Sequence, residues 1–284
     1  MLYNPGMTSN ARWRFLDIIR RPEQEIDLAE AAFLIALEEY PSLDIAAYMG
    51  RLDQLAEGAR PGVERAGENP FAVIDALNAY LFGRQRFRGN TREYFDPRNS
   101  FLNEVLDRRR GIPITLSVIY LEVASRLGFP LEGVGFPGHF LVRHSDAQRN
   151  ILVDPFHGGE ILLAADCRSR LRATFGESVP LRRQFFEPVG TKRILARMLN
   201  NLKHIYMKDG DYARALRAIE RLLMLTPDDV HQIRDRGVAR FKLVRLGSAA
   251  SDLEAYIRLV PEASDCAVVR KQLRAIRRLT AMLN

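Results

Sequence analysis

The chain has few of the residues that build disulfide-held or metal-held scaffolds. Its 284 residues include two cysteines, Cys167 and Cys266, one tryptophan and five histidines. Two cysteines so far apart in sequence form no disulfide framework, and no Cys-x-x-Cys or His-x-x-x-His spacing occurs. We therefore expect a reduced, cytoplasmic protein that uses no metal and no other cofactor.

Long apolar runs are also missing. No stretch of eighteen apolar residues occurs, so the sequence predicts no membrane-spanning helix. The first six residues, MLYNPG, lack the basic-then-apolar order of a secretion signal. A composition of 47% hydrophobic and 27% charged residues is typical of a globular protein, and 284 residues allow two modest domains.

Acidic residues are scarce only in the last third of the chain. Residues 188–284 hold 19 lysines and arginines against 10 acidic residues, a net charge of +9. The remainder holds 23 basic and 25 acidic residues, so the overall charge of +7 comes from the tail. This asymmetry bears on partners rather than on fold.

Apolar residues at helical spacing predict several helices before residue 110. We expect one from Asp27, as its cap, to Tyr40, and a second from Asp44 to Glu57 with Gly58 as its stop. A third begins at Asn69-Pro70, residues 88–90 are a break, and a short helix covers 101–108. Residues 1–26 are mixed in character and receive no assignment. These helices carry no set of catalytic residues, so their expected role is packing.

One helix and three short strands follow between Gly111 and Pro155. Pro113 suits a first helical turn, and apolar residues then repeat at helical spacing up to Leu127-Gly128. We predict short strands at residues 131–136, 139–143 and 151–155, with Pro137-Gly138 as a turn. This layout presents His139 and Asp154 at strand ends.

In order and spacing, this segment resembles the core of the transglutaminase-like superfamily, and most closely a bacterial SirB-type branch. The resemblance implies a helix headed by a nucleophilic cysteine, followed by strands that carry a histidine and an aspartate. Leu127-Gly128-Phe129-Pro130 matches the end of that helix, and His139 and Asp154 match the histidine and the aspartate. Pro113 falls at the cysteine position, so the expected Cys-His-Asp site is degenerate.

Other side chains are candidates for the missing nucleophile. Thr115 lies two positions after Pro113 on another helix face, whereas Ser117 lies four positions on and shares its face. Cys167 lies downstream of the His/Asp pair, the wrong order for this superfamily, and we interpret it as structural. His144 and His157 are near His139 in sequence, but their spacing does not indicate a metal site.

The tail contains a repeat. Thr226-Pro227 and Val260-Pro261 are 34 residues apart, the tetratricopeptide period, and Ala215 then aligns with Ala249. We predict helix pairs at 191–208 with 211–225 and at 227–244 with 248–259, and a capping helix at 266–283. The predicted fold is therefore α+β: a mostly helical transglutaminase-like domain with a small antiparallel sheet at 1–187, then an α-helical repeat domain at 188–284.

The first helix of each pair forms the concave face of such repeats, where peptides bind. Basic and amide side chains on this face suit an acidic peptide or a chain-end carboxylate, although they are equally the solvated side of a helix. The candidate partner-binding residues are Arg197, Asn200, Asn201, His204, Lys208, His231, Arg234 and Lys242.

Three functions compete. The first is a non-catalytic interaction or regulatory protein. The absence of a cysteine at residue 113 favours it, and the SirB-type resemblance implies a regulatory role. The second is a cryptic hydrolase or acyl-transfer enzyme that uses His139 and Asp154 with Ser117 or Thr115. The third is nucleic-acid binding through the basic segments 270–274 and 277–278, which lack interleaved aromatic residues and any known reading motif. We favour the first, with a protein or peptide partner and no membrane association.

Overall fold

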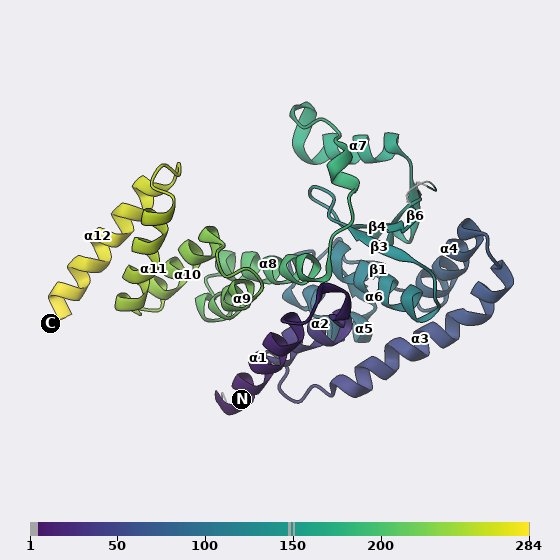
Figure 1. Cartoon of the computed structure of the whole chain (residues 1–284), viewed down its shortest axis with the longest axis horizontal. Coiled ribbons are helices and arrows are strands. Elements are labelled where there is room, and N and C mark those ends of the chain that lie inside the picture. The colour runs from purple at the N-terminus through teal and green to yellow at the C-terminus, as the bar shows by residue number, and fades with distance from the viewer. Residues whose placement is uncertain (1–4, 147–148, 150, 284) are drawn as a thin grey trace. The chain divides into compact units, whose positions relative to one another are not determined.

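The computed structural model describes residues 5–146, 149 and 151–283 (Figure 1). The chain divides into two compact units, Met1–Met198 and Leu199–Asn284. Helix α8, Thr191–Asp209, runs across this division. The domain boundary predicted between residues 187 and 188 precedes that helix and stays a prediction.

The first unit opens with a series of helices. They are α1 Pro5–Ile19, the 3₁₀ turn η1 Glu23–Glu25, α2 Leu28–Leu37, α3 Ile45–Ala66, α4 Pro70–Asn78 and the π-helix η2 Ala79–Arg84. Asp27 accepts from the amide of Glu30 at 2.8 Å and Asp44 from that of Ala47 at 3.0 Å, which confirms both caps. Helix α1 lies in the segment that the sequence left unassigned.

The stop predicted at Gly58 is wrong, because α3 continues to Ala66 and ends at Gly67, whose φ is 62°. Gly58 serves close packing instead: a Cβ at this position would overlap the hydroxyl of Tyr80 in η2. The segment at residues 88–90, which was predicted as a break between helices, contains a short strand that pairs with another strand. The short strand β1 Arg88–Gly89 pairs in parallel with β2 Arg110–Gly111.

The central segment, from residue 97 to residue 162, includes the predicted helices and strands together with elements that were not predicted. They are the 3₁₀ turn η3 Pro97–Ser100, α5 Leu102–Arg108, α6 Pro113–Arg126, β3 Leu131–Val134, β4 Leu141–His144, β5 Leu152–Asp154 and β6 Glu160–Leu162. Strands β3 to β6 form an antiparallel sheet in chain order. Strand β6 was not predicted, and the strand predicted from His139 begins at Leu141 because residues 136–139 form a turn.

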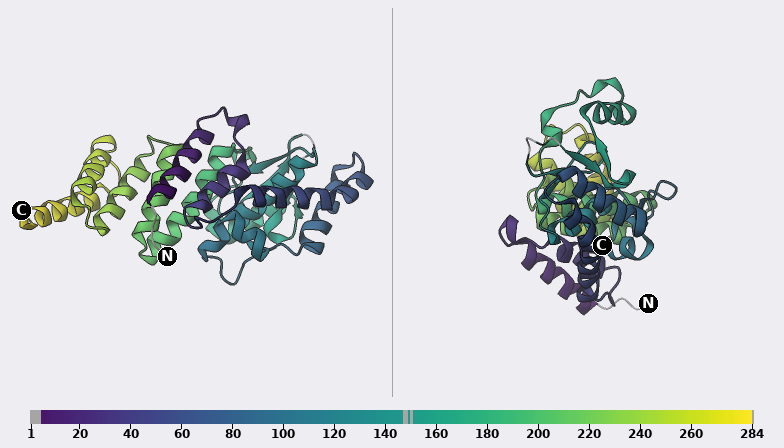
Figure 2. Two further views of the ribbon diagram at one scale, coloured as in Figure 1. Left: turned by 90° about the horizontal axis from the view of Figure 1, so that it is seen from below. Right: turned by 90° about the vertical axis from the view of Figure 1, so that its right-hand side faces the viewer.

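Helices cover both faces of this sheet. Helix α6 contacts β3 and β4, and α7, Ala164–Phe175, lies on the opposite side (Figures 1 and 2). The 3₁₀ turns η6 Gly176–Ser178 and η7 Arg183–Phe186 follow α7. Every residue of α6 from Pro113 to Leu121 is buried, so this helix is the centre of the first unit.

The second unit has the helix pairs that the 34-residue period predicts. After α8 come α9 Tyr212–Leu225, α10 Val230–Lys242, α11 Leu246–Leu259 and α12 Cys266–Leu283. The aligned alanines Ala215 and Ala249 are fully buried, and a Cβ on Gly237 of α10 would overlap Leu253 of α11. Small residues thus allow close helix approach, as expected of this repeat.

No helix among residues 5–146, 149 and 151–283 is long and apolar enough to cross a membrane.

Candidate functional site

His139 is presented by a tight turn between β3 and β4. Its amide donates to the carbonyl of Phe136 at 3.0 Å, and Gly138 adopts a φ of 68°. Proline followed by a glycine with positive φ is the pattern of a type II turn, in which no side chain fits easily at the second position. Arg197 of α8 also donates to the Phe136 carbonyl, at 3.3 Å, so the turn is held from two sides.

Asp154 ends β5 and is completely buried. Its Oδ1 accepts from the amides of Phe156 at 3.0 Å and His157 at 3.4 Å, so it caps the 3₁₀ turn η5, Pro155–His157. Pro155 suits the first position of that turn because its missing N–H would be unpaired there. Gly159 then donates to the Asp154 carbonyl at 2.9 Å and closes the loop.

Asn78 of α4 links this loop to helix α6 through two hydrogen bonds. Its Nδ2 donates to the Gly159 carbonyl at 2.8 Å, and its Oδ1 accepts from the hydroxyl of Tyr120 in α6 at 3.1 Å. Gly159 has a φ of 81°, and a Cβ there would overlap the Asn78 amide. The position of Asp154 is therefore fixed from both ends of its loop.

The predicted pairing of His139 with Asp154 is present. His139 Nε2 lies 2.8 Å from Asp154 Oδ2. Two further groups reach the same oxygen: His157 Nδ1, also at 2.8 Å, and the guanidinium of Arg170 from α7. Arg170 extends to Glu160, which pairs with Asp154 across the β5–β6 ladder.

Sequence reasoning missed the contributions of His157 and Arg170. For His157 the Asp-Pro cap indicates only that its backbone amide, three positions after Asp154, donates to the carboxylate, and it does not indicate the ring contact. Arg170 gave no signal, since it comes from a separate helix sixteen residues away whose neighbours Cys167 and Leu171 face the core.

The environment keeps His139 neutral. Burial, followed by the charges of Arg170, His157 and Arg197, lowers its pKa from the ordinary 6.5 to about 3. The Asp154 carboxylate would favour the protonated ring, but Arg170 binds the same oxygen and offsets that charge. A general base is most effective when its pKa lies near the working pH, so His139 is poorly matched to that task.

His139, Asp154 and His157 also form a possible metal-ligand set, which their sequence spacing did not indicate. Their ligand atoms all lie within 4.8 Å of one another, and two imidazoles with a carboxylate suit zinc. However, Arg170 Nη1 bonds Asp154 and lies 3.0 Å from His157 Nδ1. A guanidinium among the ligand atoms opposes a second cation, so we do not assign a metal here.

The start of α6 offers no nucleophile at the position that the resemblance gives to cysteine. Pro113 is buried there as the first helical residue. The Thr115 hydroxyl accepts from the Ile112 amide at 3.1 Å and donates to the Asn99 carbonyl at 2.8 Å. Thr115 is fully buried, so its hydroxyl is committed to capping the helix.

Ser117 is fully buried as well, and its hydroxyl has no hydrogen-bond partner among the described residues. Within the same residues, no hydrogen bond joins His139 to the Thr115 or Ser117 hydroxyl. The side chain that was the better candidate for a substitute nucleophile is therefore inside the core without a base.

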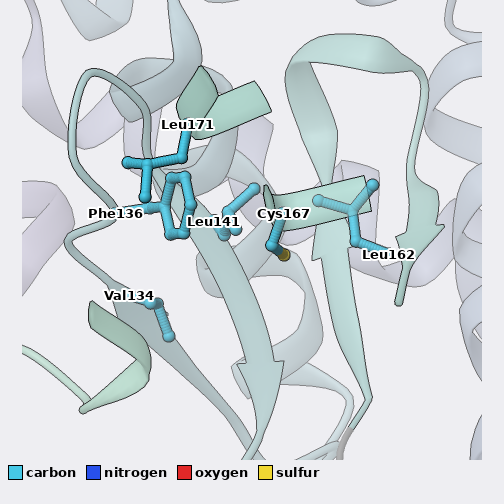
Figure 3. Close-up of a cluster of buried hydrophobic side chains, with 6 residues drawn as sticks. All are labelled: Val134, Phe136, Leu141, Leu162, Cys167 and Leu171. Atoms are coloured by element: carbon cyan, nitrogen blue, oxygen red, sulfur yellow. The ribbon is translucent and has the colours of Figure 1, made fainter. Parts of the chain in front are cut away.

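Cys167 lies in the hydrophobic cluster between the sheet and α7, among Val134, Phe136, Leu141, Leu162 and Leu171 (Figure 3). Burial raises the pKa of its thiol to about 11, and the charge of Asp166 acts in the same direction. A protonated, buried thiol is unreactive, which agrees with the structural role predicted for Cys167.

His144 lies apart from the His139 cluster. It lines a cavity of about 700 Å³ together with Arg143, Leu152, Leu162, Arg183 and Phe186. Its Nδ1 accepts from the Asp146 amide at 3.1 Å, and its ring packs edge-on against Phe129.

The candidate partner-binding residues fall in both units. Arg197 belongs to the first, where its guanidinium lies over the Phe140 ring at 5.5 Å. Asn200, Asn201, His204, Lys208 and Arg234 belong to the second. There Arg234 pairs with Asp235 at 2.7 Å and Asp265 at 2.5 Å, whereas His204 and Lys208 are exposed. The remaining two candidates, His231 and Lys242, lie at the two ends of α10.

The first unit has a buried helix, a histidine in a turn and an aspartate at a strand end, and these features define a transglutaminase-like core. The paired helices that follow define a tetratricopeptide tail. Comparison with known families agrees with this description. The transglutaminase-like superfamily matches residues 46–200, and a tetratricopeptide repeat matches residues 202–274. The chain therefore belongs to the transglutaminase-like superfamily, in its SirB-type branch.

Several known proteins are similar to this chain. A "UPF0162 protein" of Xylella fastidiosa (strain 9a5c) is 41% identical over 88% of this chain and 90% of its own length. "Protein SirB1" of Salmonella typhimurium is 28% identical over 72% of this chain and 76% of its own. "F-box only protein 21" of Mus musculus is 33% identical over 56% of this chain but 26% of its own. No solved structure matches the chain.

Stability should fall as the pH drops from 6.5 toward 3. The folded pKa of His139 is lowered, so in this interval the unfolded chain binds a proton that the folded chain does not. Each pH unit then costs about 1.4 kcal/mol, and His139→Gln should remove this slope. Urea unfolding at several pH values measures it. A His139 imidazole that titrates near 6.5 in an NMR experiment on the folded protein would contradict the prediction.

Arg170→Met should destabilise the protein by about 3 kcal/mol, because it leaves the buried Asp154 carboxylate without a cation. The matched control is Arg172→Met, two residues along the same helix, whose pair with Glu177 is exposed on both sides. The control should change stability by less than about 1 kcal/mol. Equal shifts of the denaturation midpoint in both variants would show that Arg170 does not compensate Asp154.

Proposed function

We propose that this protein is a non-catalytic member of its superfamily that acts as a cytoplasmic interaction or regulatory module. The observation that carries the proposal is the absence of a partner nucleophile: among the described residues, no hydroxyl or thiol is hydrogen-bonded to His139. Pro113, Thr115, Ser117 and Cys167 are each buried in the core or committed to other contacts.

Electrostatics supports the same proposal. In a Cys-His-Asp site the aspartate stabilises the imidazolium that forms when histidine takes the nucleophile's proton. Here Arg170 binds the same Asp154 oxygen as His139 and neutralises its charge, and His139 stays neutral. Bringing a thiol to Pro113 would therefore not by itself restore the charge balance that activates one.

The tail supports an interaction role. Tetratricopeptide repeats bind peptides along the first helices of their pairs, which here are the second-unit part of α8 and α10. Exposed His204 and Lys208, with Asn200, Asn201 and Arg234, suit an acidic peptide. Membership of the SirB-type branch favours regulation, and two buried free thiols fit a reducing cytoplasm.

A hydrolysis assay tests the proposal that the protein is not a catalyst. We expect p-nitrophenyl acetate and p-nitroacetanilide to be turned over no faster by the wild type than by His139→Ala. The control is His204→Ala, which removes an exposed imidazole capable of background ester cleavage. His139→Ala should instead lose about 1–3 kcal/mol of stability, because Asp154 loses a buried partner. Turnover abolished by His139→Ala alone would establish an enzyme.

Titration calorimetry with hexaglutamate tests the proposal that the first helices of the repeat pairs bind an acidic peptide. We expect His204→Glu and Arg234→Glu to weaken binding about tenfold, since each places a negative charge on the first-helix face. Arg258→Glu, exposed on the second helix α11, is the matched control and should bind as the wild type does. His204→Glu keeps the test decisive if Arg234→Glu unfolds. Equal affinities in all three variants would rule out this face.

A further inference from the structure

Arg197 of α8 is a half-buried cation. Within the described residues its guanidinium contacts the Phe136 carbonyl at 3.3 Å and the Phe140 ring at 5.5 Å, and no carboxylate pairs with it. Burial lowers its pKa, so the site costs free energy as it stands. A largely desolvated charge is normally paired, and an unpaired one indicates a binding site for the opposite charge.

His139 is next to this arginine in the fold, because the His139 backbone amide and the Arg197 guanidinium donate to the same carbonyl of Phe136. Besides burial, the charge of Arg197 also acts on the His139 ring and lowers its pKa. Since Nε2 faces the Asp154 carboxylate, it carries the ring proton, and Nδ1 is left as an acceptor. Nδ1 has no hydrogen-bond partner among the described residues, and the side chain is 14% exposed. A ligand can therefore donate a hydrogen bond to it.

Tyr94 completes the group. Its ring packs edge-on against Phe156 at 6.1 Å, and Phe156 packs edge-on against His139 at 5.9 Å. The Tyr94 hydroxyl has no hydrogen-bond partner in the part of the chain that the structure describes, and the residue is 38% exposed. Tyr94 and His139 thus pack against the same Phe156 ring, and the charge of Arg197 acts to lower the pKa of both, so Arg197 lies within electrostatic range of the two side chains.

We propose that Arg197, Tyr94 and His139 bind a peptide carboxylate together with the amide next to it. A planar carboxylate accepts from the Arg197 guanidinium and the Tyr94 hydroxyl, and the neighbouring amide N–H donates to His139 Nδ1. A chain-end carboxylate carries this combination. Phosphate matches it less well, because its oxygens would face the Nδ1 lone pair.

This inference rests on the proposed function, because a site without a nucleophile leaves its ligand intact. The donor–acceptor pattern also explains why a neutral His139 is useful here. A protonated ring would lose the acceptor and add charge beside Arg197 and Arg170.

NMR of the full chain with labelled histidine tests the proposal. N-acetylglycine, which has a carboxylate and an adjacent amide, should shift the His139 signals in a saturable way. N-acetylglycinamide, the uncharged match, should bind at least about tenfold more weakly, because a charge-assisted pair is lost. Inorganic phosphate serves as the competing anion.

Arg197→Gln should weaken N-acetylglycine binding about tenfold. Arg193→Gln, exposed and one turn earlier in α8, should leave it unchanged. Because Arg197 also holds the Phe136 turn, Tyr94→Phe provides a second test that removes a hydroxyl and keeps the ring. Unchanged affinity in Arg197→Gln and Tyr94→Phe would overturn the proposal, as would equal binding of the neutral amide or tighter binding of phosphate.

Release of acetate from either probe would have a different meaning. Saturable binding with cleavage would keep the carboxylate site but contradict the non-catalytic function. Intact probe without binding would overturn the site and leave the non-catalytic function in place.

Discussion

The buried carboxylate of Asp154 is the constraint on which the site depends. An ion removed from water costs several kcal/mol unless charges and hydrogen bonds replace its hydration. Here two backbone amides of η5, two imidazoles and the guanidinium of Arg170 replace it. These groups come from the turn after β3, the end of β5 and helix α7, so one charge draws separate elements of the first unit together.

The site has two ends, the head of α6 and the Asp154 cluster. At the head of α6, Pro113 stands where the superfamily resemblance places the cysteine, and the nearby Thr115 hydroxyl caps the helix. At the other end, Arg170 satisfies Asp154, so the imidazole need not carry charge. These contacts give a neutral imidazole that bonds Asp154 through Nε2, and its Nδ1 has no hydrogen-bond partner among the described residues.

Local patterns predicted the fold where periodicity or capping decides the structure. Asp27, Asp44 and the 34-residue spacing of Pro227 and Pro261 placed helix starts and the repeat, and the pairing of His139 with Asp154 followed from the superfamily resemblance. Features set by distant contacts were not predictable. Gly58 resembles a helix stop but faces Tyr80, and Arg170 reaches Asp154 only because α7 folds over the sheet. The site around Arg197 could not be predicted from the sequence either. Its neighbours in sequence do not show that Arg197 has no acidic partner among the described residues.

The segment after η7 has a further consequence for the sheet. Pro188 bridges to Val134, and the Val189 amide donates to the Gly133 carbonyl at 2.9 Å. This short stretch therefore covers the outer edge of β3, whose free backbone groups would otherwise be open to strand addition by another chain. Proline suits the place, since it lacks an N–H and cannot extend the ladder further. A fragment that stops before residue 188 would expose this edge, and self-association rather than unfolding would be its first failure.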